Sequence, residues 1–259
     1  MINENLHKKA VALDRVKHRE LKLNLSARDM STVNQLNAFF VAGTEFTDAC
    51  KEFPVVWVNA GTDTDGKQQV APIAVFGLKQ GQNLCTDDKG WRVRYVPAVL
   101  RLYPFALARV AANEMVVCVD ESWLGLGSEG EALFNSAGEP SEFTANVQKQ
   151  LENFETEVER TRLAGALLVE HALLRDMRFD ATLPDGSKLT VDGFLTIDED
   201  KLAKLSDADL LTFNRNGLMG LIHAHQISLG NMAKLVEWHV ERAGASSTPA
   251  AAGAAAATH

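Results

Sequence analysis

The chain has 259 residues, of which 46% are hydrophobic and 23% are charged, and its formal net charge is −8. This composition is close to the globular average, so a hydrophobic core can offset the entropy of ordering the chain without the help of disulfide bonds. The 26 basic residues are scattered and form no stripe that could neutralise a phosphate backbone, which excludes nucleic acid as an expected partner.

The first half of the chain is expected to be rich in antiparallel β-structure. Short runs of Val, Ile and aromatic residues alternate with turn clusters of Gly and Asp, as in antiparallel strands joined by short connections. One short helix is expected at Thr44 to Lys51, before Pro54. The predicted strands are Leu21 to Leu25, Val55 to Asn59, Val70 to Leu78, Trp91 to Ala98, Phe105 to Ala111 and Met115 to Val119.

A long amphipathic helix is predicted after Pro140. The apolar residues Phe143, Val147, Leu151, Phe154 and Val158 recur at spacings of three and four, which places them on one helical face. On the outer face, Glu157 can pair with Arg160 and Glu159 with Arg162 at i,i+3. We expect this helix to end near Asp176.

The last third of the chain is predicted to be a β-hairpin followed by helices. Met177 to Thr182 and Ser187 to Ile197 flank the turn sequence Leu183-Pro184-Asp185-Gly186. Ser206 is a candidate helix N-cap, and Gly217 is a candidate helix end before another helix begins near Leu218.

We therefore expect one α+β domain over residues 1–242, folded around one core. From Ala243 to the end the sequence is almost wholly Ala, Gly, Ser, Thr and Pro, so no large apolar side chain can hold it in place. Residues 243–259 are predicted to be a disordered tail.

Several classes of site and location are not expected. Residues 1–9 lack the apolar stretch of a secretory signal. The apolar run from Leu163 to Leu174 is far shorter than the roughly 18 residues of a membrane span. Cys50, Cys85 and Cys118 lack metal-ligand spacing, as do His223 and His225, which stand two apart in a helical pattern. We expect a soluble cytoplasmic protein with no metal site, and the sequence leaves any cofactor unknown.

The candidates for acid–base chemistry are Asp120, Glu121 and His225. Asp120 and Glu121 follow directly after the apolar run Met115 to Val119, at a strand end where functional carboxylates often lie. His225 could approach them only through folding. The alternative is that the two carboxylates and the histidine have structural roles.

The segment from Trp91 to Phe105 is the densest in aromatic, arginine and proline residues. Aromatic rings and guanidinium groups at this density can form a stacking surface for a planar or anionic ligand. They can equally form an irregular edge of the core, with arginine stems covering aromatic faces. The candidate ligand-binding residues are Trp91, Arg94, Tyr95, Arg101 and Tyr103.

The order of several short motifs resembles the SapC family of bacterial proteins over nearly the whole chain except the tail. The motifs are Glu45 with Phe53-Pro54-Val55, Gly77-Leu78, Gly81-Gln82-Asn83-Leu84, Trp91 with Tyr95-Val96-Pro97, Arg101 with Tyr103-Pro104-Phe105, Asp120-Glu121, Gly193-Phe194, Asn216-Gly217-Leu218, His225 and Ser228. The resemblance implies an association with bacterial surface layers. It also implies an accessory role beside flavin-dependent halogenase-like proteins, and it supplies no catalytic residues.

Three functional hypotheses remain open. The first is a non-catalytic accessory protein that binds a small molecule or a partner through the Trp91 to Phe105 segment. The second is an enzyme that uses Asp120 or Glu121 with His225. The third is a surface-layer component, which would place the protein at the cell surface. A homodimer is also possible.

Overall fold

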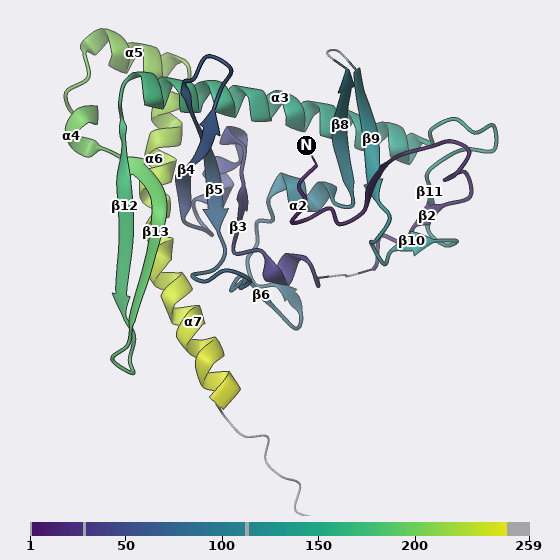
Figure 1. The fold of residues 1–259 in the computed structure, drawn as a ribbon, viewed down its shortest axis with the longest axis horizontal. Coiled ribbons are helices and arrows are strands. Elements are labelled where there is room, and N and C mark those ends of the chain that lie inside the picture. The colour runs from purple at the N-terminus through teal and green to yellow at the C-terminus, as the bar shows by residue number, and fades with distance from the viewer. Residues whose placement is uncertain (1, 28–29, 112–113, 248–259) are drawn as a thin grey trace, which may run out of the picture.

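The computed structural model describes residues 2–27, 30–111 and 114–247, and within them the fold is α+β, as the sequence predicts. Antiparallel sheets fill the N-terminal half, followed by a long helix, a β-hairpin and the C-terminal helices (Figure 1). Residues 248–259, most of the predicted tail, lie outside the described ranges.

The largest sheet has five strands in the order β12-β13-β4-β5-β3, and every neighbouring pair is antiparallel. The predicted strands at Val55 and Val70 and the predicted hairpin of Met177 to Ile197 are confirmed. Gly66 and Gly186 close the two hairpin turns with positive φ angles of 77° and 81°, which favour glycine. The strands are β3 (Ala38–Phe40), β4 (Val55–Thr62), β5 (Gln68–Val75), β12 (Leu174–Thr182) and β13 (Lys188–Ile197).

A second antiparallel sheet has the order β1-β9-β8, and its last two strands confirm the predictions at Phe105 and Met115. The remaining pairings are short, and the predicted strand Leu21 to Leu25 is reduced to two residues. The strands are β1 (Ala10–Ala12), β2 (Lys22–Leu23), β6 (Thr86–Asp87), β7 (Gly90–Trp91), β8 (Phe105–Ala111), β9 (Glu114–Asp120), β10 (Leu126–Gly127) and β11 (Glu131–Ala132).

The predicted strand Trp91 to Ala98 is wrong. Only Gly90–Trp91 pairs as a strand, and Ala98–Leu102 forms the short helix α2. Pro97 has no N–H to donate to a neighbouring strand, and the N–H of Ala98 is taken by the side chain of Glu45. The backbone of residues 92–97 is therefore irregular, and the aromatic and β-branched side chains of this segment project from it.

The predicted helix near Thr44 consists of a 3₁₀ turn, η2 (Gly43–Glu45), followed by α1 (Phe46–Ala49). A further 3₁₀ turn, η1 (Val33–Gln35), precedes β3. The η2 turn packs beside the long helix, and this contact positions residues 43–49.

The long helix α3 (Glu142–Glu170) runs across the molecule from the β8–β9 sheet to the five-stranded sheet (Figure 1). Ser141 caps its start by accepting a hydrogen bond from the N–H of Thr144. The prediction that it ends near Asp176 is wrong. The chain turns at Ala172, whose φ is 51°, and Leu174 to Asp176 pair with β13 instead. Cross-strand pairing overrides the helical pattern there.

Four helices follow β13 in the part of the chain that the structure describes: α4 (Glu199–Leu202), α5 (Asp207–Arg215), α6 (Leu218–Ser228) and α7 (Asn231–Ser247). The predicted cap is confirmed, because Ser206 accepts from the N–H of Asp209 at 3.1 Å. Gly217, with a φ of 84°, separates α5 from α6 as predicted. Helix α7 continues past Ala243 to Ser247, into the range predicted as the tail, and alanine favours helix.

The buried apolar side chains form two clusters within the described ranges. The larger includes Phe46, Trp57 and Phe76. The smaller surrounds Phe105 and Val119. Helix α3 contributes to both, and Tyr103 packs against both. The prediction of a single domain over residues 1–242 stays a prediction.

Gly165 allows α3 to lie directly on the large sheet. A Cβ atom there would be 2.9 Å from the carbonyl oxygen of Val70 and 3.3 Å from the ring of Trp57. We expect Gly165→Ala to lower the free energy of unfolding by about 1 to 3 kcal/mol, measured by urea denaturation.

Gly220→Ala in α6 is the matched control, because nothing lies within 4 Å of the position that the added Cβ would take. That variant should raise the free energy of unfolding by up to about 1 kcal/mol through helix propensity. Stabilisation by Gly165→Ala would contradict the close approach of α3 to the sheet.

Candidate functional site

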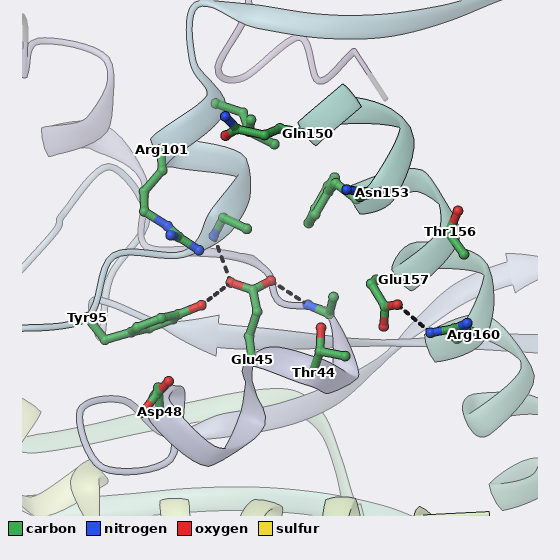
Figure 2. A pocket seen from close by; sticks show the side chains of 14 residues that line it. Thr44, Glu45, Asp48, Tyr95, Arg101, Gln150, Asn153, Thr156, Glu157 and Arg160 are labelled. Carbon is green, nitrogen blue, oxygen red and sulfur yellow. Dashed lines mark hydrogen bonds and ion pairs between the residues drawn. The ribbon is translucent and has the colours of Figure 1, made fainter. Parts of the chain in front are cut away.

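An open cleft of about 630 Å³ lies between α3, the α2 segment and the η2–α1 turn (Figure 2). We call it the Glu45 cleft, after the carboxylate on its floor. It is lined by Ala42, Thr44, Glu45, Asp48, Tyr95, Ala98, Arg101, Leu102, Gln150, Asn153, Phe154, Thr156, Glu157 and Arg160. Its volume lies within the range of small-molecule sites.

Glu45 is a buried carboxylate that accepts three hydrogen bonds. The hydroxyl of Tyr95 and the N–H of Ala98 each donate to Oε1 at 2.7 Å, and the N–H of Ala42 donates to Oε2 at 2.8 Å. A buried carboxylate is tolerated only when such donors replace water. Glu45 therefore joins the η2 turn to the start of α2 and fixes the floor of the cleft.

Tyr95 and Arg101 form the wall that faces this floor. Burial, and then the neighbouring Glu45, raise the pKa of the Tyr95 hydroxyl, so it stays protonated and donates. The guanidinium carbon of Arg101 lies 5.7 Å from the centroid of the Tyr95 ring. Arg101 makes no ion pair with any residue in the described ranges, and its guanidinium points into the cleft in Figure 2.

The opposite wall is one face of α3. Gln150, Asn153, Glu157 and Arg160 are spaced by three or four residues, which aligns them along the helix (Figure 2). Arg160 donates to Glu157 at 2.7 Å, which confirms the predicted i,i+3 pair, and the Glu159–Arg162 pair is confirmed as well. The cleft thus has a polar wall with hydrogen-bonding amides.

Four of the five predicted ligand-binding residues line one or both of two hollows. Tyr95 and Arg101 line the Glu45 cleft, whereas Trp91, Arg101 and Tyr103 line a second hollow of about 490 Å³. Trp91 also packs edge-on against Phe76 inside the core. Arg94 is exposed and lines neither hollow. Arg101 is the residue that reaches both.

Asp120 lies fully buried at the end of β9. It accepts hydrogen bonds from the N–H groups of Lys8, Lys9 and Ser122 and from the hydroxyls of Ser122 and Tyr103. Burial by itself raises the pKa of Asp120, but these hydrogen bonds outweigh it and hold the pKa below its usual range. Asp120 attaches the N-terminal segment to the β8–β9 sheet.

Glu121 is partly buried and contacts three basic side chains: Lys17, Lys9 and His18. Hydrogen bonds from these groups lower the pKa of Glu121 to about 2. A carboxylate with so low a pKa is a poor proton acceptor near neutral pH.

His225 is buried between α6 and the large sheet. Its Nδ1–H donates to the carbonyl of Val55 at 2.7 Å, and its Nε2 accepts from the hydroxyl of Thr196 at 3.0 Å and from the N–H of Ile197 at 3.3 Å. Burial lowers the pKa of His225 to about 4, although the hydrogen bond to Val55 opposes this. The neutral ring joins α6 to β4 and β13.

The structure does not bring the three acid–base candidates together. Asp120 and His225 share no hydrogen-bond partner among the described residues, and β9 and α6 lie toward opposite ends of α3 in Figure 1. Neither residue lines the Glu45 cleft. Each is held by structural contacts where it lies.

Sequence reasoning missed Glu45 as a site residue and missed the polar face of α3. Gln150, Asn153 and Glu157 have a helical spacing that is visible in the sequence, but the same spacing is typical of any solvated helix face. Two of the three hydrogen bonds of Glu45 come from residues 50 and 53 positions away, so no local pattern predicts them.

Two further classes of feature are absent from residues 2–27, 30–111 and 114–247. Those ranges hold no group of three or more His, Cys, Asp or Glu side chains arranged to bind a metal ion. None of the helices within them combines the length and the apolar character needed to cross a membrane.

The fold and the cleft define an α+β protein in which a long helix closes one side of an open, polar cavity. The family model SapC matches residues 13–235, and the chain belongs to the SapC family. No curated protein and no solved structure gives a significant match.

We expect Asp120→Asn to lower the free energy of unfolding by about 2 to 3 kcal/mol, because the amide nitrogen cannot accept the hydrogen bonds that the carboxylate accepts. Glu121→Gln is the matched neighbouring control and should have a clearly smaller effect, since solvent screens its ion pairs. Urea denaturation measures both. Equal effects would contradict a structural role specific to Asp120.

His225 should make stability depend on pH. Its pKa is lowered from 6.5 to about 4 on folding, so the unfolded chain binds the proton more tightly. Stability is fully present above pH 6.5 and is lost as the pH falls toward 4, by up to about 3 kcal/mol. Burial also lowers the pKa of His7 and of His239, and these two residues add to the same trend.

His225→Gln should lower stability at pH 7 and flatten its dependence on pH between 6.5 and 4, measured by urea denaturation at each pH. His223→Gln is the control, because His223 is exposed two residues away on α6, and it should change stability by less than about 0.5 kcal/mol. An unchanged slope in His225→Gln would show that His225 does not cause the dependence.

Proposed function

We propose that the protein is a non-catalytic binding protein that holds a small anionic molecule in the Glu45 cleft. The observation that carries this proposal is Arg101, whose guanidinium points into the cleft without an ion-pair partner among the described residues. A guanidinium presents five N–H donors in a planar fork that matches carboxylate and phosphate groups.

The other charges of the cleft already have partners. Glu45 accepts its three hydrogen bonds, Asp48 pairs with Lys51 at 2.8 Å, and Glu157 pairs with Arg160. Arg101 is therefore the charged group of the cleft that has no ion-pair partner among the described residues. An incoming anion would pair with it without breaking an existing ion pair.

The surroundings of Arg101 favour binding over a solvated surface role. Its guanidinium lies over the Tyr95 ring, and the hydroxyl of that ring is held by Glu45. A side chain that is already positioned loses less conformational entropy when a ligand binds. The amides of Gln150 and Asn153 on the opposite wall can supply directional hydrogen bonds to the same ligand.

The binding hypothesis is better supported than the enzyme hypothesis. An acid–base pair requires its groups within hydrogen-bond reach of one substrate, and Asp120 and His225 have separate surroundings away from the cleft. An accessory role beside a flavin-dependent halogenase-like protein, a homodimer, and a cytoplasmic or surface location remain predictions from the sequence.

Arg101→Gln should weaken the binding of anions, and Arg94→Gln is the matched control from the same segment. Phosphate, citrate and benzoate are suitable probes, with thermal denaturation and calorimetry as readouts. Losing a charge-assisted hydrogen bond of about 1.5 kcal/mol or more should weaken binding at least about tenfold in Arg101→Gln. Arg94→Gln should bind like the unaltered protein.

Native mass spectrometry of the full-length protein, with metal analysis of the same sample, gives an independent test. A co-purified anion that is lost in Arg101→Gln would support the proposal. Equal losses in both arginine variants, or no binding of any anion, would contradict it.

A further inference from the structure

A second hollow continues from the Glu45 cleft along α3. We call it the Leu163 groove; its volume is about 400 Å³ and it lies between α3, α6 and the η2 turn. Its walls include the apolar side chains of Leu163, Ala164, Leu167, Leu218 and Leu221. Thr44, Glu157 and Arg160 line both hollows, so the two share a boundary.

One face of α3 forms a continuous wall for both. Asn153, Glu157 and Arg160 face the Glu45 cleft, and Ala164 and Leu167 continue the same spacing into the Leu163 groove. The face therefore changes from polar to apolar at Arg160. With a rise of 1.5 Å per residue, Leu167 lies about 10 Å along the helix axis from Arg160.

Two features keep the groove open to solvent. Leu163 is 51% exposed, although it is a large apolar side chain on a helix that packs against the sheet. Gly43 lines the groove, where an added Cβ would be 3.2 Å from a methyl group of Leu221. A side chain at position 43 would therefore fill part of the groove.

We infer that the ligand is amphipathic, with an anionic group at Arg101 and an aliphatic chain that crosses the Glu157–Arg160 pair into the Leu163 groove. This inference rests on the proposed function, because the anion site is the Arg101 wall of the Glu45 cleft. The small volume of the groove and its continuity with the polar cleft favour the chain of a small molecule over a protein surface, which would need a larger contact area.

Calorimetric titration of the full-length protein with hexanoate, octanoate and decanoate, below their micelle concentrations, tests the inference. Each methylene buried in the groove should tighten binding by about fourfold. Leu163→Asp should remove this dependence on chain length and leave hexanoate binding nearly unchanged. Arg101→Gln should weaken all three carboxylates by a similar factor.

Leu211→Asp is the matched control, because Leu211 on α5 is 49% exposed and lines neither hollow. It should keep the full dependence on chain length, and circular dichroism of the three variants should show that each is folded. A dependence that survives in Leu163→Asp, or is lost in Leu211→Asp, would overturn the inference.

The two proposals fail in different ways. Carboxylates that bind through Arg101 with affinities independent of chain length would overturn the amphipathic ligand and leave the proposed function intact. Carboxylates unaffected by Arg101→Gln would overturn both. A protein dimer that Leu163→Asp dissociates would assign the groove to a second copy of the chain, and would also overturn the inference.

Discussion

The three hydrogen bonds to the buried carboxylate of Glu45 fix the geometry on which the proposed site depends. Two of them join Glu45 to Tyr95 and to the first residue of α2, 50 and 53 positions away in the chain, and the third comes from Ala42 at the start of the η2 turn. The segment between β7 and β8 has almost no strand pairing to hold it. Glu45 supplies that constraint, and Arg101 is positioned over the Tyr95 ring as a result.

Buried polar groups join distant segments elsewhere in the molecule as well. Asp120 holds the N-terminal residues against the end of β9, and His225 holds α6 against β4 and β13. Hydrogen bonds outweigh burial and lower the pKa of Asp120, and burial lowers the pKa of His225, so both pKa values move away from the range useful for proton transfer. Residue types that suggest catalysis in a sequence can therefore serve in the fold to hold distant segments together.

The elements governed by neighbouring residues were predictable, and those governed by distant contacts were not. Turn glycines, the Ser206 cap and the apolar face of α3 follow from backbone and side-chain preferences over a few residues. The end of α3 follows instead from the pairing of residues 174–176 with β13. The course of residues 92–97 follows from the hydrogen bond that Glu45 accepts from Ala98. Tertiary contacts override a local pattern where they satisfy more buried groups.

Residue patterns alone were enough to predict the α+β class, the main hairpins, the long helix and the family, and they included Tyr95 and Arg101 among the candidate binding residues. The folded chain was needed to show that Trp91 packs into the core, that Arg94 lies outside both hollows and that Glu45 and the polar face of α3 complete a cleft. Periodicity and capping act within a few residues along the chain, so they can be recognised in a sequence. The burial and the donors that give a side chain its role come from segments that only folding brings together.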